Sequence, residues 1–469
     1  MTGLLNRPRR LHFVGIGGAG MSGIAELCLR LGFIVSGCDL KESATTSRLR
    51  SLGADIHGGH HAAHIVAALD AVVISSAVKF SNPEVARARE LKIPVIPRAE
   101  MLGELLRMAR VGIAIAGTHG KTTTTALVGL ILEEAGLDPT VAIGGNLRAK
   151  GTNVRLGQGD FMVAEADESD ASFLLLVPSI AVVTNIDPEH LDHYGSLERV
   201  REAFLNFINR VPFYGRAIVG IDSANVRGLL PSVRKPITTY GIAADAEIRA
   251  EKIVIDGLST RFDVIGSGTR LGQIEIPTPG RHVAVNSLAA IGVALEIGID
   301  FERIARALGS FSGISRRFEI KGEAGGVIVV DDYAHHPEEV KATLAAARAA
   351  FKRRIVAVFQ PHRYTRLRDL FDEFLSAFDD ADVLYLMDVY SAGEDPIPEV
   401  TARRLYEAML KRGHLDVRYL GASQYPATTL AADVAAGDLA MTLGAGDVYK
   451  LGEELLVALD AGAKRHEQA

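Results

Sequence analysis

The chain has little of several features that define whole classes of proteins. Only two of its 469 residues are cysteines, which excludes a disulfide framework and a cysteine-rich zinc site. It has no run of the roughly 18–20 apolar residues that cross a membrane, and no apolar stretch with a small-residue cleavage site follows the basic amino terminus. It also lacks a basic surplus, because the net charge is −6. We therefore expect a cytoplasmic protein without nucleic-acid or membrane partners.

The composition is that of a folded multidomain protein. Hydrophobic residues make up 48% and charged residues 23%, which argues against disorder. At roughly 100–200 residues per domain, the length indicates about three domains. We find no short-period repeat and no low-complexity tract, and we predict domains at 1–108, 109–314 and 315–469.

Short apolar runs alternate with helical patterns along most of the chain. Apolar runs on both sides of helices predict parallel sheets that helices cover on both faces, and hence an α/β fold. From about 217 to 276 the pattern changes to short β segments with little helix. The expected strands are 11–16, 34–37, 71–75, 111–116, 161–166, 180–184, 327–330, 355–359, 383–387, 416–420 and 439–443, and the expected helices are 21–31, 84–91, 101–110, 122–135, 283–297, 338–351, 367–378, 401–412 and 425–435.

A glycine-rich loop follows the expected strand 111–116 and opens the next helix. It reads Gly117-Thr118-His119-Gly120-Lys121-Thr122-Thr123. Its glycines let backbone amides turn toward a phosphate, and the helix N-terminus adds about half a positive charge. Lys121 would reach the β and γ phosphates, and the Thr122 hydroxyl would bind Mg²⁺. Ile115 replaces the first glycine of the usual pattern, and an ordinary glycine-rich turn is the alternative.

Two acidic segments follow the next two expected strands. One runs from Glu165 to Asp170, and the other from Asn185 to His190. Ligands of open α/β sheets bind at the carboxyl ends of the strands, and Mg²⁺ prefers oxygen ligands. The two segments therefore favour a magnesium site over a set of helix caps.

A second glycine motif lies near the amino terminus. Gly15-Ile16-Gly17-Gly18-Ala19-Gly20 fits the pattern G-x-G-x-x-G, and Asp39 follows about twenty residues later. Alone, this motif suggests NAD and a dehydrogenase. That interpretation leaves the loop at Lys121 and both acidic segments without a role, so it is the minor alternative.

The motifs together resemble the bacterial Mur ligases over essentially the whole chain. The resemblance rests on the Lys121 loop, both acidic segments and Asp332-Tyr333-Ala334-His335-His336-Pro337. It implies three domains. These are a Rossmann-like domain for a UDP substrate, a central P-loop ATPase domain with a mostly parallel sheet and a small β segment, and a C-terminal Rossmann-like domain that brings the amino acid.

The opening segment from His12 to Ser22 resembles the family member that acts first. This implies that ATP drives an amide bond between L-alanine and the lactyl carboxylate of UDP-N-acetylmuramate through an acyl phosphate. The products would be UDP-N-acetylmuramoyl-L-alanine, ADP and phosphate, as a step in peptidoglycan precursor synthesis. A monomer or weak dimer is expected. Two alternatives are a recycling ligase that attaches a preformed tripeptide and a non-catalytic scaffold.

The resemblance also implies roles for individual residues. Lys121, Glu165 and His190 would be catalytic, with Thr122, Glu165 and His190 holding Mg²⁺. ATP would also contact His282, Asn286, Arg317 and Asp332. The UDP substrate would contact Gly15, Gly17, Gly18, Ala19, Gly20, Gly145 and Asn146. L-alanine would contact His362, Arg363 and Arg366.

Two positions depart from the family pattern. Val283 stands where asparagine usually follows the histidine of the adenine-binding helix. No lysine lies between Asp187 and Arg234, so the carbamylated lysine of several relatives has no counterpart. The general base stays open between His193 and a metal-bound water.

Overall fold

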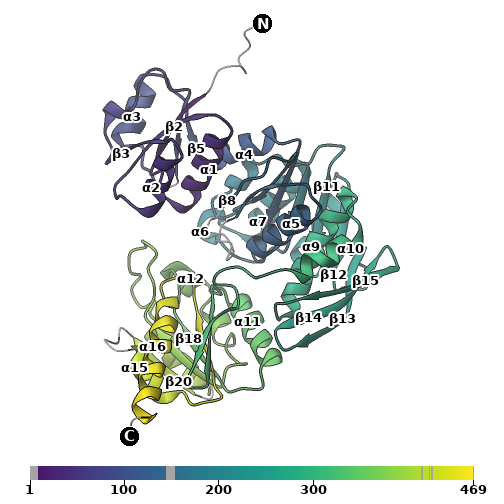
Figure 1. Ribbon diagram of the computed structural model, residues 1–469, viewed down its shortest axis with the longest axis vertical. Coiled ribbons are helices and arrows are strands. Elements are labelled where there is room, and N and C mark those ends of the chain that lie inside the picture. Colours follow the sequence, from purple (N-terminus) through teal and green to yellow (C-terminus); the bar gives the residue numbers. More distant parts are fainter. Residues whose placement is uncertain are drawn as a thin grey trace. The chain divides into compact units, whose positions relative to one another are not determined.

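The computed structural model describes residues 9–75, 77–143, 154–413, 416–421, 423 and 426–467 (Figure 1). It divides into two compact units, one of Met1–Ile248 with Leu288–Ile304 and one of Arg249–Ser287 with Ala305–Ala469. Both units are built from mostly parallel sheets and helices, so the predicted α/β fold is confirmed. Among the residues described, no helix has the length and apolarity needed to span a membrane.

The first unit begins with a five-stranded parallel sheet in the order β3-β2-β1-β4-β5. Successive residues of β1 enter different cores, with Phe13 in one and Val14 in the other, because helices cover both faces. Strand order reverses between β1 and β4, which is where such sheets bind ligands. The strands are β1 (Arg10–Val14), β2 (Ile34–Asp39), β3 (Asp55–Gly58), β4 (Ala71–Ile74) and β5 (Val95–Pro97), and the helices are α1 (Ala19–Arg30), α2 (Ala44–Ser51), η1 (Ala62–His64), α3 (Pro83–Glu90) and α4 (Arg98–Met108).

A second sheet of the first unit carries the Lys121 loop. Within this unit, its strands run in the order β12-β11-β10-β6-β9-β7-β8. Strand β6 lies between β9 and β10 and is parallel to both, so the segments that follow these three strands meet at one edge. The strands are β6 (Val111–Ala116), β7 (Thr140–Ala142), β8 (Val154–Arg155), β9 (Phe161–Glu165), β10 (Ile180–Val183), β11 (Arg216–Gly220) and β12 (Ile237–Gly241), and the helices are α5 (Lys121–Glu134), η2 (Ser172–Leu175), α6 (Leu191–Tyr194), α7 (Leu197–Asn209), α8 (Ala224–Arg227) and η3 (Leu230–Ser232).

The second unit begins with strands β13 (Ile248–Asp256), β14 (Ser259–Gly266) and β15 (Thr269–Ile276), which agree with the expected β segment. Strands β14 and β15 form an antiparallel hairpin. Helix α9 (Arg281–Ile297) follows and crosses between the units, and α10 (Phe301–Gly309) comes next.

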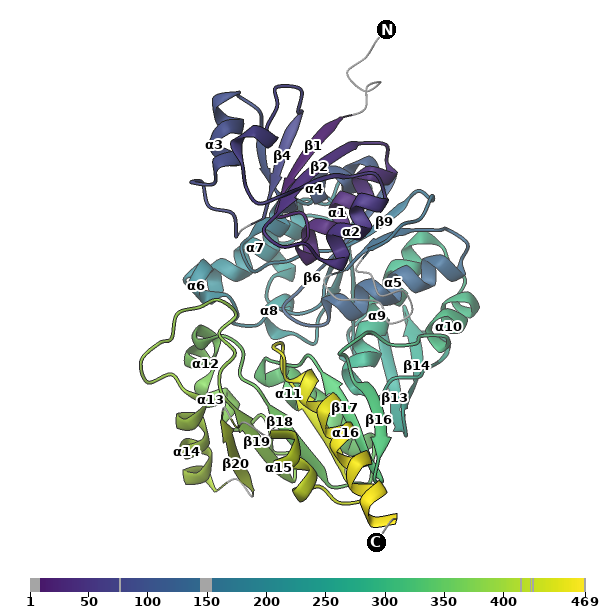
Figure 2. The same cartoon turned by 60° about the vertical axis from the view of Figure 1, so that its left-hand side comes forward.

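The second unit also contains a six-stranded sheet in the order β16-β17-β21-β18-β19-β20. Only β16 is antiparallel to its neighbour, and α16 lies along β16 and β17 (Figure 2). The strands are β16 (Glu319–Ala324), β17 (Val327–Asp332), β18 (Ile355–Phe359), β19 (Val383–Met387), β20 (Val417–Gly421) and β21 (Leu439–Leu443), and the helices are α11 (Pro337–Ala350), α12 (Tyr364–Asp369), α13 (Phe371–Phe374), α14 (Ala402–Arg412), α15 (Pro426–Asp433) and α16 (Tyr449–Glu467).

One expected helix, 367–378, is wrong. The chain instead forms the short helices α12 and α13, which are separated by Leu370 at φ −119° and ψ 25°. The apolar spacing that suggested one helix serves tertiary packing, because Phe374 and Phe378 both contact the ring of Phe359. Packing against β18 therefore overrides local helical periodicity.

Candidate active site

The loop between β6 and α5 has a backbone that requires glycine. Gly117 has φ 136° and Gly120 has φ 82°, backbone angles that residues other than glycine rarely adopt. A Cβ atom on Gly117 would lie 1.9 Å from the Thr184 hydroxyl oxygen. Helix α5 begins directly after the loop, at Lys121. The sequence pattern therefore produces the strand–loop–helix geometry of an anion-binding helix N-terminus.

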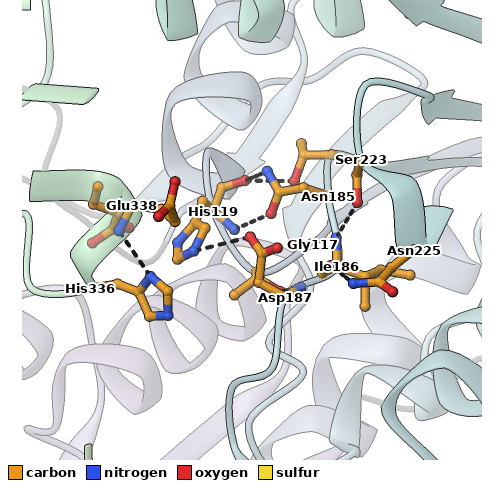
Figure 3. A network of polar contacts seen from close by, with 12 residues as sticks. Gly117, His119, Asn185, Ile186, Asp187, Ser223, Asn225, His336 and Glu338 are labelled. Carbon is orange, nitrogen blue, oxygen red and sulfur yellow. Dashed lines mark hydrogen bonds and ion pairs between the residues drawn. The ribbon is translucent and has the colours of Figure 1, made fainter. Parts of the chain in front are cut away.

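The segment after β10 holds this loop in place (Figure 3). The Asn185 side chain accepts from the His119 amide at 2.7 Å and donates to the His119 carbonyl at 3.1 Å. The Thr184 hydroxyl donates to the same carbonyl at 2.6 Å, and the Asp187 amide donates to the Thr118 hydroxyl at 2.9 Å. Two side chains and a backbone amide that follow the neighbouring strand thus fix the loop before any ligand binds, which lowers the entropy cost of binding.

A further layer supports that segment in turn. The Asn225 amide donates to the Ile186 carbonyl at 2.8 Å, and the Ile186 amide donates to the Ser223 hydroxyl at 3.3 Å (Figure 3). Both supporting residues belong to the region around α8. They lie outside the recognisable motifs, so no pattern in the sequence marks them.

Lys121 is held at the centre of the site. Its ammonium group donates to the Gly117 carbonyl at 2.6 Å and to the Thr118 carbonyl at 3.1 Å, and lies 2.8 Å from a Glu168 carboxylate oxygen. Burial lowers the pKa of Lys121, but the carboxylates of Glu168 and Glu165 more than offset this effect, so the net pKa is raised. Lys121 is therefore a fixed positive charge at neutral pH.

Glu168 is the partner of Lys121 that sequence reasoning did not single out. Burial raises its pKa to about 7, although the Lys121 ammonium opposes this rise. The Tyr194 hydroxyl donates to the Glu168 carbonyl at 2.6 Å and positions its backbone. Glu168 was one of four acidic residues in its segment, and only the folded chain distinguishes it from the others.

Oxygen ligands suited to magnesium gather beside the loop. The Thr122 hydroxyl donates to Glu165 at 3.1 Å, so two of the predicted metal-binding residues are in contact. The third, His190, has φ 57° and places its Nε2 atom 3.9 Å from Glu168. Glu168, Glu189 and His190 also present ligand atoms within 4.8 Å of one another. A hydroxyl and several carboxylates form a donor set that Mg²⁺ prefers.

The first residue of the N-terminal glycine motif lines a pocket. Gly15 has φ 76°, and the Gly17 amide donates to Asp39 at 2.9 Å. A pocket of about 390 Å³ opens where β1, β2 and β4 end, and Gly15, Asp39, His60 and Asn82 are among its lining residues. The pocket therefore occupies the point at which strand order reverses.

The other predicted residues of this motif lie at the start of α1. Gly18 precedes the helix, Ala19 is its first residue, and a Cβ atom on Gly20 would lie 2.7 Å from an Arg98 side-chain nitrogen. Gly145 and Asn146, which were also predicted to contact the UDP substrate, lie outside the described residues.

In the second unit, Asp332 supports the turn that carries Arg317. Its two carboxylate oxygens accept from the Phe318 and Ala334 amides, each at 2.7 Å. Burial raises the Asp332 pKa to about 6, and Arg317 opposes this rise. The Arg317 guanidinium lies 5.2 Å from the centre of the Tyr333 ring. Asp332 thus positions the backbone on which the predicted nucleotide-binding arginine stands.

His282 and Asn286 lie four residues apart near the start of α9, and therefore on the same face of the helix. Burial and the nearby Arg317 charge lower the His282 pKa to about 4, so its imidazole is neutral at pH 7. The His282 ring packs directly against the backbone of Gly280, because a Cβ atom at position 280 would lie only 2.5 Å from that ring.

The predicted amino-acid segment at the end of β18 has an internal ion pair. Arg363 donates to Glu394 at 2.6 Å, whereas Arg366 donates to the His362 ring at 3.3 Å. The His362 ring stacks on Tyr390 with centroids 5.5 Å apart, and burial with the adjacent Arg366 charge lowers its pKa to about 4. Sequence reasoning missed Glu394, which lies in an irregular loop without a motif.

Models of one protein family match nearly the whole chain. They are the "Mur ligase family, catalytic domain" at residues 10–110, the "Mur ligase middle domain" at 115–294 and the "Mur ligase, glutamate ligase domain" at 316–446. The chain belongs to the Mur ligase family. The dehydrogenase interpretation of the N-terminal motif is therefore not retained.

Within this family, the chain is similar to a particular ligase. It is 55% identical to the UDP-N-acetylmuramate–L-alanine ligase of Anaeromyxobacter sp. (strain Fw109-5), over 97% of this chain and 99% of that protein. A solved UDP-N-acetylmuramate–alanine ligase from Thermotoga maritima has a TM-score of 0.77 and 28% identity, covering 98% and 99%. A murein peptide ligase from Psychrobacter arcticus 273-4, with a TM-score of 0.68, 24% identity and coverage of 96% and 99%, shares the fold.

Proposed function

We propose that this chain is an ATP-dependent ligase that joins the amino group of L-alanine to the lactyl carboxylate of UDP-N-acetylmuramate. This is the first peptide step of peptidoglycan precursor synthesis. The observation that carries the proposal is the held Lys121 loop, in a chain 55% identical over nearly its full length to a ligase of that name. We further propose a cytoplasmic monomer or weak dimer with domains at 1–108, 109–314 and 315–469.

The loop residues from Gly117 to Thr123 would bind the phosphates of ATP. Lys121 is charged at neutral pH, so it would supply positive charge to the γ-phosphate once a phosphate oxygen replaces one of its present acceptors. Thr122, Glu165 and His190 would hold Mg²⁺, which supplies further positive charge at the phosphates. We assign adenine contacts to His282 and Asn286, and phosphate and ribose contacts to Arg317 and Asp332.

The acceptor is proposed to bind at the N-terminal pocket. Gly15, Gly17, Gly18, Ala19 and Gly20 would contact the diphosphate of UDP, and Gly145 and Asn146 would contribute to the same substrate. A backbone turn at a helix N-terminus suits a diphosphate because its amides donate without adding a bulky side chain.

In this proposal, the reaction proceeds in two steps. A lactyl carboxylate oxygen attacks the γ-phosphorus, the bond to the β–γ bridging oxygen breaks, and ADP leaves. The alanine amine then attacks the acyl carbon and loses a proton to the general base, and the bond from the acyl carbon to the phosphorylated oxygen breaks, so that phosphate leaves with the oxygen that had attacked phosphorus. Lys121 cancels the repulsion between the carboxylate and the triphosphate in the first step.

L-alanine is proposed to bind at His362, Arg363 and Arg366. A guanidinium matches a carboxylate because its donors meet two oxygens at once. Glu394 neutralises Arg363, so we assign the alanine carboxylate to Arg366 and a positioning role to Arg363.

Phosphate release from Mg·ATP tests the proposal. The full chain is supplied with UDP-N-acetylmuramate and, in parallel, with L-alanine, other amino acids or the preformed tripeptide. Release that depends on L-alanine, with the expected product mass, supports the proposal. Release with the tripeptide alone indicates the recycling ligase, and ATP binding without release with any amine donor indicates a scaffold; either outcome contradicts it.

A further inference from the structure

A buried group of metal-binding side chains lies beside the N-terminal sheet, away from the Lys121 loop. It consists of His12 on β1, Cys38 on β2, His60 and His64 between β3 and β4, and Glu84 in the first turn of α3. His12 and Glu84 are fully buried, with 0% exposure. His12 opens the segment that carries the family resemblance, but neither the resemblance nor the proposed reaction assigns a role to any of these residues, so their convergence needs its own explanation.

Glu84 is the centre of the group. Its Oε1 atom lies 2.6 Å from His64 Nδ1 and 3.5 Å from His12 Nε2. Its Oε2 atom accepts from Cys38 Sγ at 2.8 Å and lies 3.2 Å from His60 Nδ1. A fully buried carboxylate is costly unless it is paired or binds a metal.

The decisive atom is Nε2 of His12. It is buried, faces Glu84 and has no hydrogen-bond partner among the described residues. The other ring nitrogen lies 2.9 Å from the Ser36 hydroxyl, which donates to the Leu11 carbonyl at 3.4 Å. With the proton on Nδ1, as a donor to Ser36, the Nε2 lone pair would face a Glu84 carboxylate oxygen 3.5 Å away. Two electron-rich atoms facing each other inside the protein favour a cation between them.

We propose that His12 Nε2, His64 Nδ1 and Glu84 Oε1 bind a divalent cation, zinc by the chemistry of the set. Two imidazoles and one carboxylate suit zinc, whereas magnesium prefers oxygen ligands. All three ligand atoms lie within 4.8 Å of one another. Two ligand atoms on one tetrahedral zinc are about 3.3 Å apart. The distance of 3.5 Å between His12 Nε2 and Glu84 Oε1 already fits this value, and the distance of 2.6 Å between His64 Nδ1 and Glu84 Oε1 would lengthen. A water completes the coordination.

The surrounding contacts resemble the outer shell of a metal site. Ser36 orients His12 through the ring nitrogen that does not face the metal position. Cys38 and His60 contact the Glu84 oxygen that the metal does not use. Such outer contacts set the tautomer of ligating histidines and the orientation of ligating carboxylates. A rival set of Cys38, His60 and Glu84 also has ligand atoms within 4.8 Å, but it contains no atom like His12 Nε2, which is buried without a hydrogen bond.

The metal would be structural. It would join β1, the segment that follows β3, and α3. His60, in the segment after β3, and Asn82, directly before α3, both line the nearby pocket. Its expected role is to fix that pocket wall, with no part in bond formation. The inference does not depend on the proposed function, because it concerns only the N-terminal sheet and its metal content.

The test measures zinc binding by the full chain purified without an affinity tag. The protein is treated with a chelator, dialysed, and titrated with zinc against a chromogenic chelator, and bound metal is counted by mass spectrometry. The same titrations are made on His12→Gln, on His64→Gln and on His57→Gln. His57 is the matched control, since its ring stacks on His64 at 4.4 Å without joining the proposed set. A His190→Gln variant accounts for zinc bound at the candidate active site.

We expect His12→Gln and His64→Gln each to bind one zinc fewer than the wild type, and His57→Gln to retain it. Zinc should also raise the thermal midpoint of the wild type by several degrees and leave that of His12→Gln unchanged. Cys38→Ser should retain the metal. Should a variant fail to fold, the wild-type stoichiometry decides. The proposal is overturned if the folded wild-type chain does not bind this zinc. It is also overturned if Cys38→Ser loses the zinc while His12→Gln retains it.

Discussion

The two glycine loops of the first unit use the same backbone device with different chemistry. Both follow a parallel strand, both contain glycine at positive φ, and both precede a helix. The loop at Gly15 contains no charged side chain, and its Gly17 amide donates to Asp39 at 2.9 Å. The loop at Gly117 ends in Lys121, whose ammonium lies 2.8 Å from Glu168.

This difference separates binding from catalysis. Backbone amides at a helix N-terminus suffice to bind an anion, which is the role we propose for the first loop. Moving a phosphoryl group onto a carboxylate also requires positive charge that is fixed before the reaction. Only the second loop supplies a cation of this kind, and Glu168 together with Asn185 holds its parts in place.

The largest expected effect is on turnover when Lys121 is replaced. Lys121→Met removes the fixed charge while preserving much of the side-chain volume, and kcat should fall about 10³-fold. The exposed Lys411→Met is the matched control and should leave kcat unchanged. Phosphate release measures both variants, and normal turnover by Lys121→Met would remove the basis for the comparison of the loops.

The two loops should also differ in their tolerance of a methyl group. Gly117→Ala places a Cβ atom 1.9 Å from Thr184 Oγ1 at φ 136°, and we expect a loss of about 2–4 kcal/mol in unfolding free energy. Gly15→Ala has nothing within 4 Å and strains only a φ of 76°, so about 1 kcal/mol is expected. Urea unfolding compares the two variants, and equal losses would contradict the distinction.

Removal of the Arg366 guanidinium should affect neither loop. Arg366→Ala loses a charged hydrogen-bond donor, and the KM for L-alanine should rise about 10- to 100-fold. The KM values for ATP and UDP-N-acetylmuramate should change little. Arg404→Ala, an exposed arginine of α14, is the control. An unchanged KM for L-alanine in Arg366→Ala would place the amino-acid site elsewhere.

The smallest effect concerns the magnesium dependence of the second loop. His190→Gln keeps a polar side chain but removes the imidazole, so half-saturation by Mg²⁺ should rise several-fold. Steady-state rates over a magnesium series measure it, with His57→Gln for comparison. If the two variants have the same magnesium dependence, His190 is not a ligand.

Much of the fold and part of the site could be predicted from local patterns. The glycine and lysine spacing located the second loop, and the rule that ligands bind at the carboxyl ends of strands singled out the acidic segment beside it. The family resemblance paired Thr122 with Glu165, and the two side chains are in contact. Most expected strands and helices are present. The helix at 367–378 was wrong because packing on Phe359, which the local pattern does not contain, separates it into α12 and α13.

Other features depend on contacts that no sequence spacing encodes. Glu168 could not be distinguished from Asp167 or Asp170, because the segment after β9 is irregular and lacks a periodic face. The backbone amides that bind Asp332 became known only with the turn at Phe318. The meeting of His12 with Glu84 required the whole N-terminal sheet, since β1 and α3 are distant in the chain. The chemistry of a local motif was therefore easier to predict than the contacts between residues that are distant in the sequence.

The two loops are proposed to act on one substrate, in that the acceptor bound by the first loop is phosphorylated at the second. Transfer of ¹⁸O from UDP-N-acetylmuramate labelled in its lactyl carboxylate, with unlabelled ATP and L-alanine, measures this phosphorylation. We expect one ¹⁸O atom in each phosphate released, because the carboxylate oxygen that attacks the γ-phosphorus leaves with it. Formation of the alanyl product with entirely unlabelled phosphate would exclude phosphorylation of the acceptor.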